Sequence, residues 1–158
     1  MVILCAGGAA RAVAVELLLA GVGKMTVVNR GAARGQQMMG NLLQHFPAKA
    51  PRFTEWRGAQ RVGKEVDILI NATSIGLYPD TSMPEVNLDE ARSDLLVCDA
   101  IPNPPDTRLL QEARRRGLRT LNGLAMLVYQ GAIGFEMWTG RKADEGAMKA
   151  ALAKAFGI

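Results

Sequence analysis

Apolar residues follow two different patterns along this chain. Short runs rich in Val, Ile and Leu indicate strands, and longer segments with apolar residues three or four positions apart indicate helices. The expected strands are Val2–Ala6, Met25–Val28, Val66–Ile70, Leu95–Ile101 and Arg119–Leu121. The expected helices are Ala9–Ala20, Ala33–Phe46, Thr107–Arg116, Gly123–Trp138 and Asp144–Phe156. The segment from Pro47 to Val62 is ambiguous, with one short strand expected near Phe53.

The order of these elements predicts the fold class. Strands that alternate with helices are typical of βαβ units and therefore of a parallel sheet. The run Val66–Ile70 has no clear polar face, and Ala9–Ala20 is apolar nearly all round, as expected where helices pack on both sides of a central sheet. We expect one domain over residues 1–158, of class α/β: a Rossmann-like, doubly wound parallel sheet with helices on both faces.

The turn after the first strand carries the first candidate chemistry. It reads Cys5-Ala6-Gly7-Gly8-Ala9-Ala10-Arg11 and leads into a helix. The dinucleotide fingerprint G-x-G-x-x-G/A maps onto Cys5, Gly7 and Ala10, so that the helix N-terminus would face the phosphates. Cys5 replaces the glycine of the tight turn, which predicts a looser turn. Small residues also suit any tight strand-to-helix turn, and that reading stays open.

The end of the second strand discriminates between cofactors. An NAD enzyme places an acid there, about twenty residues after the loop, to bind the ribose 2′-hydroxyl. This chain has Asn29-Arg30, followed by Arg34, and no acid. A guanidinium fits a 2′-phosphate instead, so NADP is preferred over NAD. The alternative is that both arginines are ordinary surface charges, although cations at a helix N-terminus oppose its dipole.

Five segments in register resemble the shikimate/quinate dehydrogenase family, in particular its C-terminal NADP-binding domain and a divergent branch of it. The segments are Ala6–Arg11, Asn29-Arg30 with Arg34, Asn71–Leu77, Asp99–Leu110 and Asn122–Ala132. The resemblance implies hydride transfer between NADPH and a ring ketone of the 3-dehydroshikimate or quinate type in the intact enzyme, as in aromatic amino acid biosynthesis. It implies a small-molecule substrate of that type as the partner.

The resemblance also implies roles for matching positions. The residues that it assigns to the pyrophosphate loop are Cys5, Ala6, Gly7, Gly8 and Ala9. Those assigned to the adenosine 2′-phosphate are Asn29, Arg30 and Arg34. Thr73 and Ser74 would line the ribose and nicotinamide side, and Ala100 and Gly123 would contact the nicotinamide end through backbone. Met126 would pack near the ring and Gln130 would bind a substrate hydroxyl; these two are four residues apart and share a helix face.

Two departures from the family limit the transfer of function. Pro102 stands where the family usually has a tyrosine in the substrate pocket, so the exact substrate stays open. The family's N-terminal substrate domain, with its Lys–Asp pair for proton transfer, has no counterpart here. We therefore expect no catalytic residue in this chain and little activity from it alone. The alternatives are a non-catalytic dinucleotide-binding module, or another NADP enzyme with a similar half, which Asn71–Gly76 and Gly123–Gln130 argue against.

Composition and charge argue against several other classes of protein, such as nucleic-acid-binding and membrane proteins. The net charge is +4, but aromatic residues make up only 5% and the dense basic run Arg114–Arg116 falls at a helix end, so no nucleic-acid partner is expected. No apolar run is long enough for a membrane span, which predicts a cytoplasmic protein without a membrane partner. Cys5 and Cys98 are expected to be buried reduced thiols, His45 to be exposed, and no metal is expected. An apolar surface left by the absent domain would favour homo-oligomers.

Overall fold

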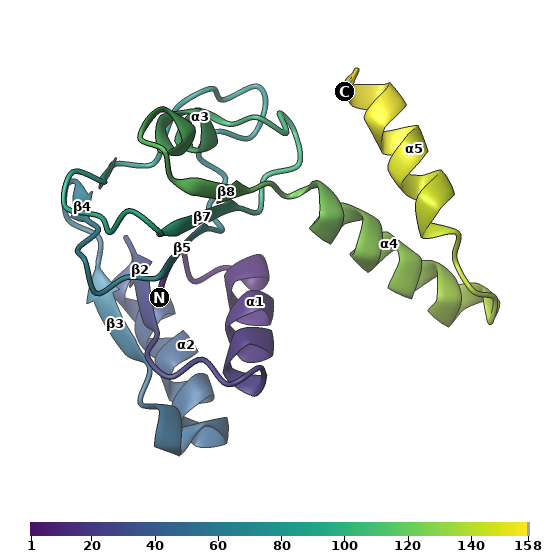
Figure 1. The fold of residues 1–158 in the computed structure, drawn as a ribbon. Helices are drawn as coiled ribbons and strands as arrows, with labels where there is room; N and C mark the ends of the chain where they lie inside the picture. Colours follow the sequence, from purple (N-terminus) through teal and green to yellow (C-terminus); the bar gives the residue numbers. More distant parts are fainter. Residues whose placement is uncertain (158) are drawn as a thin grey trace.

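A six-stranded parallel sheet forms the centre of the molecule (Figure 1), which is a computed structural model that describes residues 1–157. Its strands are β1 (Val2–Leu4), β2 (Thr26–Asn29), β3 (Arg52–Glu55), β5 (Ile68–Asn71), β7 (Leu96–Asp99) and β8 (Arg119–Leu121). Their order across the sheet is β3-β2-β1-β5-β7-β8, and every neighbouring pair is parallel. The order reverses direction between β1 and β5, which creates the crevice where open α/β sheets bind ligands.

Helices cover both faces of this sheet, as the sequence predicts. The helices α1 (Gly8–Leu19) and α2 (Ala32–His45) pack on one face, where Ala10, Ala14 and Met38 join Ile3 in one buried cluster. The helix α3 (Arg108–Arg115) packs on the other face, where Leu109 joins Leu4 in a second cluster. Successive residues of β1 therefore point into different cores, because side chains alternate along a strand. The predicted fold class is confirmed.

Several boundaries differ from the expected ones, for local reasons. The first strand ends at Leu4 rather than Ala6, because Cys5 has a φ of 102° and turns the chain away. The segment between α2 and β5 holds a 3-10 helix, Pro47–Lys49, and the strand β4 (Gln60–Arg61). β4 pairs with β6 (Val86–Asn87) in a separate two-stranded sheet. Strands of two residues are too short to show a hydrophobic period, so the sequence pattern did not predict them.

The helix α1 is less buried than its apolar sequence suggested. Only Ala10, Ala14 and Leu18 are buried, and Leu19 is 66% exposed. The expectation of a helix enclosed nearly all round is therefore wrong. One stripe of small side chains packs on the sheet, and the opposite side of α1 stays open.

The two C-terminal helices form a hairpin that extends away from the sheet (Figure 1). They are α4 (Leu124–Thr139) and α5 (Glu145–Phe156), joined through Gly140, whose φ of 66° is the left-handed conformation that ends a helix. α4 buries only Val128 and Ala132, and α5 buries no residue completely. Within residues 1–157, no helix is both long and apolar enough to cross a membrane.

Candidate dinucleotide-binding site

The turn from β1 into α1 contains a residue in a left-handed conformation. Cys5 adopts a positive φ of 102°, which glycine accommodates more easily than other residues. The Cys5 Sγ accepts a hydrogen bond from the Gly7 N–H at 3.2 Å. A Cβ added at Gly8 would meet no other atom, which leaves the helix N-terminus open for a ligand.

The helices that face the crevice begin without side-chain caps. α1 begins after Gly7 and α2 after Gly31, so neither N-cap residue has a side chain that could accept a hydrogen bond, and neither first turn holds an acid; α4 likewise begins after Gly123. By contrast, Thr107 caps α3 and Asp144 caps α5. An uncapped N-terminus presents free N–H groups and the positive end of the helix dipole, which together favour an anion. Both α1 and α2 thus offer sites for phosphate groups.

Asn29 ties the two helix starts together. Its Oδ1 accepts a hydrogen bond from the Ala6 N–H at 3.1 Å, and its Nδ2 donates one to the Gly31 carbonyl at 2.8 Å. The sequence reading gave Asn29 a direct role at the 2′-phosphate. In the structure both ends of its side-chain amide bind backbone, so its visible effect is to fix the phosphate loop against the start of α2.

Arg30 and Arg34 lie at the start of α2 with their side chains exposed. Neither pairs with an acidic side chain among residues 1–157, although several other arginines of the chain do. Nearby, Arg11 Nη2 donates a hydrogen bond to Gln37 Oε1 at 3.1 Å and so links α1 to α2. Two unpaired guanidinium groups therefore flank an uncapped helix N-terminus.

Polar side chains fix the turn after β5. Thr73 Oγ1 donates to Asn71 Oδ1 at 2.7 Å, and the Ile75 N–H donates to Thr73 Oγ1 at 3.0 Å. Ser74, the other residue predicted here, is exposed. Asn71 and Asp99 are buried at the ends of neighbouring strands. The sequence analysis gave neither of them a role, although a polar residue that ends an apolar strand is a visible signal.

The backbones of Ala100 and Gly123, the two residues predicted to contact the nicotinamide end, lie close together. A Cβ on Gly123 would lie 2.5 Å from the Ala100 carbonyl oxygen, so only glycine fits there. Met126 and Gln130 follow on α4; both are exposed, and Gln130 Nε2 donates to the Leu127 carbonyl of its own helix at 3.0 Å. Pro102 is half-buried in the loop after β7, where its neighbour Asn103 accepts a hydrogen bond from the Tyr78 N–H at 2.9 Å.

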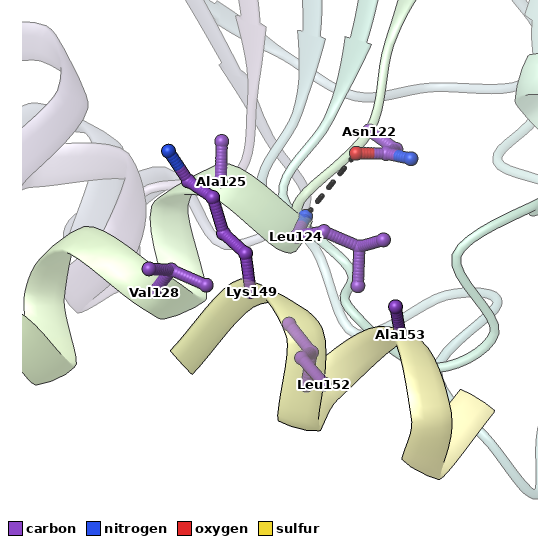
Figure 2. A pocket seen from close by; sticks show the side chains of 7 residues that line it. All are labelled: Asn122, Leu124, Ala125, Val128, Lys149, Leu152 and Ala153. Carbon is purple, nitrogen blue, oxygen red and sulfur yellow. Dashed lines mark hydrogen bonds between the residues drawn. The ribbon is translucent and has the colours of Figure 1, made fainter. Parts of the chain in front are cut away.

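Figure 2 shows a pocket of about 250 Å³ between α4 and α5 that is distinct from this site. Apolar side chains dominate its lining, and the Asn122 Oδ1 accepts a hydrogen bond from the Leu124 N–H at 3.3 Å at its rim. Lys149 crosses it toward Tyr129, whose hydroxyl lies 3.2 Å from Nζ. None of the predicted cofactor residues lines it. It is a gap in the packing of the helix hairpin.

The remaining titratable candidates are one histidine and two cysteines. His45 is exposed at the end of α2, where Nδ1 lies 2.8 Å from the Asn41 carbonyl. Cys5 and Cys98 are free but half-buried rather than fully buried. Burial raises the pKa of Cys98 to about 11, which keeps this thiol protonated near neutral pH. Among residues 1–157, no three His, Cys, Asp or Glu side chains gather where a metal ion could bind.

These features define a class of protein. The strand order, the glycine-rich turn after β1 and the two uncapped helices beside the crevice are those of a dinucleotide-binding α/β domain. The family model described as "Shikimate 5'-dehydrogenase C-terminal domain" matches residues 123–153. The chain belongs to the shikimate dehydrogenase family and corresponds to the C-terminal domain of its members.

Known proteins match the chain over nearly its whole length. The shikimate dehydrogenase (NADP(+)) of Methanopyrus kandleri is 39% identical over 153 residues, which is 96% of this chain and 53% of that protein. A 5-ketofructose reductase of Gluconobacter sp. strain CHM43 has a TM-score of 0.89 and 44% identity, over 98% of this chain and 56% of that one. A shikimate dehydrogenase solved with NADP+ has a TM-score of 0.80 and 36% identity, over 98% and 54%. The chain spans about half the length of the curated relatives it matches.

Proposed function

We propose that this chain binds NADP and forms the cofactor half of an NADP-dependent oxidoreductase. The observation that carries the proposal is the start of α2, where Arg30 and Arg34 are exposed, unpaired with acids among residues 1–157, and next to an uncapped helix N-terminus. A 2′-phosphate would gain from both the guanidinium groups and the helix dipole. NAD has only a hydroxyl at that position, and neither the end of β2 nor the first turn of α2 holds an acid to accept its hydrogen bond.

The rest of the crevice fits a dinucleotide. The N–H groups at the start of α1 would hold the pyrophosphate, and the Asn29 contacts would keep that loop in place. The close approach of Gly123 to Ala100 leaves backbone, rather than side chain, at the nicotinamide end. NADP, when bound, supplies the hydride chemistry. The residues of this chain would bind and orient it.

The substrate-binding half of the intact enzyme would pack against α4. Exposed apolar side chains follow one side of this helix: Met126, Tyr129, Ile133 and Met137. Solved relatives are nearly twice as long as this chain, and the segment beyond the match is long enough to form another domain. That half would also supply the groups for proton transfer, since the only histidine lies at the far end of α2. Gln130, on the same helix, would then contact the substrate.

Two kinds of substrate are candidates. Most named relatives are shikimate dehydrogenases, which favours a ring ketone of the dehydroshikimate or quinate type. The similarity to a 5-ketofructose reductase favours a polyhydroxy ketone instead, because both its identity of 44% and its TM-score of 0.89 exceed the values for the NADP-bound shikimate dehydrogenase. Pro102 removes the hydroxyl contact that the family's tyrosine would make, which counts against the first candidate.

The test of the proposed cofactor is calorimetric titration of the chain with NADP+ and, separately, NAD+. We expect NADP+ to bind and NAD+ to bind at least about tenfold more weakly, because a charge-assisted contact to a buried or oriented phosphate contributes about 1.5–3 kcal/mol. Arg30→Gln should weaken NADP+ binding by a similar factor and leave NAD+ unchanged. Arg141→Gln, an exposed arginine in the turn between α4 and α5, is the matched control. Binding of neither nucleotide, or tighter binding of NAD+, would refute the proposal.

A further inference from the structure

A buried carboxylate joins the ends of β5 and β7. Asp99 is only 2% exposed, and its Oδ1 accepts hydrogen bonds from Asn71 Nδ2 at 3.1 Å and from the Ile101 N–H at 3.0 Å. Its Oδ2 accepts one from Thr107 Oγ1 at 2.7 Å. Among residues 1–157, no Lys, Arg or His pairs with it. A buried charge without a counter-ion is costly, so its three donors must hold it in one fixed arrangement.

The hydrogen bond between Asn71 and Asp99 helps to fix the direction of the Asn71 amide, whose Nδ2 also donates to the Ile75 carbonyl at 3.4 Å. A carboxylate only accepts hydrogen bonds, so Asn71 must turn its NH₂ group toward Asp99. Its Oδ1 then faces Thr73, which donates both its N–H, at 3.1 Å, and its hydroxyl, at 2.7 Å. The turn after β5 is thus oriented from Asp99, two hydrogen bonds away.

The other hydrogen bonds to Asp99 hold the loop after β7. The bond from the Ile101 N–H fixes the chain at Ala100, whose carbonyl lies against Gly123 at the start of α4. Thr107 connects the same carboxylate to α3, because its hydroxyl also accepts a hydrogen bond from the Leu110 N–H at 3.4 Å. One side chain therefore sets the position of two loops at the carboxyl edge of the sheet.

We propose that Asp99 is a positioning residue for the nicotinamide half of the cofactor site. It is too buried to touch a ligand and acts through Asn71 and Thr73 on one side and through Ile101 and Ala100 on the other. The proposal rests on the proposed NADP binding. It has a specific consequence: loss of the carboxylate weakens contacts to the nicotinamide end, and the adenosine end, held by α1 and α2, keeps its affinity.

Two ligands distinguish the contributions of the nicotinamide end and the adenosine end of the site to binding. NADP+ contacts both, and adenosine 2′,5′-bisphosphate lacks the nicotinamide and its ribose. In Asp99→Asn the side chain keeps a single acceptor oxygen, which can serve Asn71 and Ile101 or Thr107 but not all three donors, and the charge that strengthens these hydrogen bonds is lost. We expect calorimetry to show NADP+ binding about tenfold weaker and bisphosphate binding changed by less than about twofold, since a lost charge-assisted hydrogen bond has about that effect.

A second pair of variants keeps the test independent of whether Asp99→Asn folds. Thr107→Val removes one donor to the carboxylate with little change of shape, and Thr107→Ser restores it. The selective loss of NADP+ affinity should appear in the valine variant and disappear in the serine variant. Val97→Ala, a core truncation two residues earlier on β7, is the control for general destabilisation and should not separate the two ligands.

Three results would decide against the inference. If the Asp99 and Thr107 variants weaken both ligands equally, or neither, while the wild-type chain binds both, the positioning role is refuted and NADP binding stands. If the wild-type chain binds the bisphosphate and gains nothing from the nicotinamide half, the positioning role is refuted as well. If the wild-type chain binds neither ligand, the proposed function fails and the inference fails with it.

Discussion

Cys5 holds a backbone conformation that glycine adopts at lower cost. A non-glycine residue at positive φ costs on the order of 1–3 kcal/mol, and the surrounding ladder keeps Cys5 there: its N–H donates to the Val28 carbonyl at 2.7 Å. Its sulfur also accepts the Gly7 N–H, a donor that the phosphate loop would otherwise present to an anion. The family's glycine has neither effect, so the substitution bears on both stability and cofactor binding.

We therefore expect Cys5→Gly to raise the free energy of unfolding by about 1 kcal/mol and to strengthen NADP+ binding severalfold. Urea unfolding followed by circular dichroism gives the first quantity, and calorimetry gives the second. Cys5→Ala is the control, because it frees the Gly7 N–H and keeps the cost of the positive φ. If the glycine variant is less stable than the alanine variant, the strain attributed to position 5 is absent.

Sequence reasoning identified residues whose signal is local and missed those whose role depends on long-range contacts. The sequence before the helix that ends at Arg116 offers Asp106 or Thr107 as its N-cap, and in the structure the cap is Thr107. Asn71 and Asp99 are 28 residues apart, and their hydrogen bond exists only because β5 and β7 pair in register. Asn29 was assigned to the cofactor because the resemblance to the family implies that role. Its contacts with Ala6 and Gly31 became visible only when the strand and loop were placed together.

At the scale of elements, periodicity was sufficient wherever an element is long enough to show a period. The helix patterns predicted all five α-helices to within a few residues, and the apolar runs predicted the central strands of the sheet. Periodicity could not predict the short strands β4 and β6, because each has only two residues and is held by one long-range pairing. The pattern also could not predict how much of each helix is buried. The sequence of α1 is apolar on nearly all sides, yet only Ala10, Ala14 and Leu18 are fully buried.

The helix hairpin should be the least stable element of the domain. α5 has no fully buried residue, and α4 buries only Val128 and Ala132, whereas β1, β5 and β7 lie in the centre of the sheet. Local opening is easiest where few apolar contacts are lost. Hydrogen–deuterium exchange followed by mass spectrometry should show α5 exchanging first and the central strands last. Slow exchange of α5, equal to that of the strands, would mean that the hairpin is held by contacts absent from this arrangement.

At the scale of the whole molecule, the charge and the apolar surface have different locations. Ion pairs gather around α3, where Arg114, Arg115 and Arg116 each bind an acid, so much of the basic charge is neutralised locally. Arg30 and Arg34, which pair with no acid among residues 1–157, lie at the start of α2, beside the crevice. The most exposed large apolar side chains lie near the end of α4, where Met137 is 78% exposed and Trp138 is 87% exposed. The molecule therefore has one surface for an anionic ligand and another for an apolar protein surface.

In the absence of a covering domain, the apolar side of α4 should cause self-association, because contiguous exposed apolar patches are rare on monomeric proteins. We expect the sedimentation coefficient of the chain to rise with concentration. Ile133→Lys combined with Met137→Lys should abolish this rise and leave NADP+ affinity unchanged, since neither residue belongs to the cofactor site. The control pair, Leu19→Lys with Leu43→Lys, adds the same charge to exposed positions on α1 and α2 and should still associate. If both pairs abolish association, net charge rather than the α4 surface is its cause. If the unmodified chain stays monomeric at all concentrations, the apolar side of α4 does not drive association, and its exposure has to be explained by contacts that it makes in a longer chain.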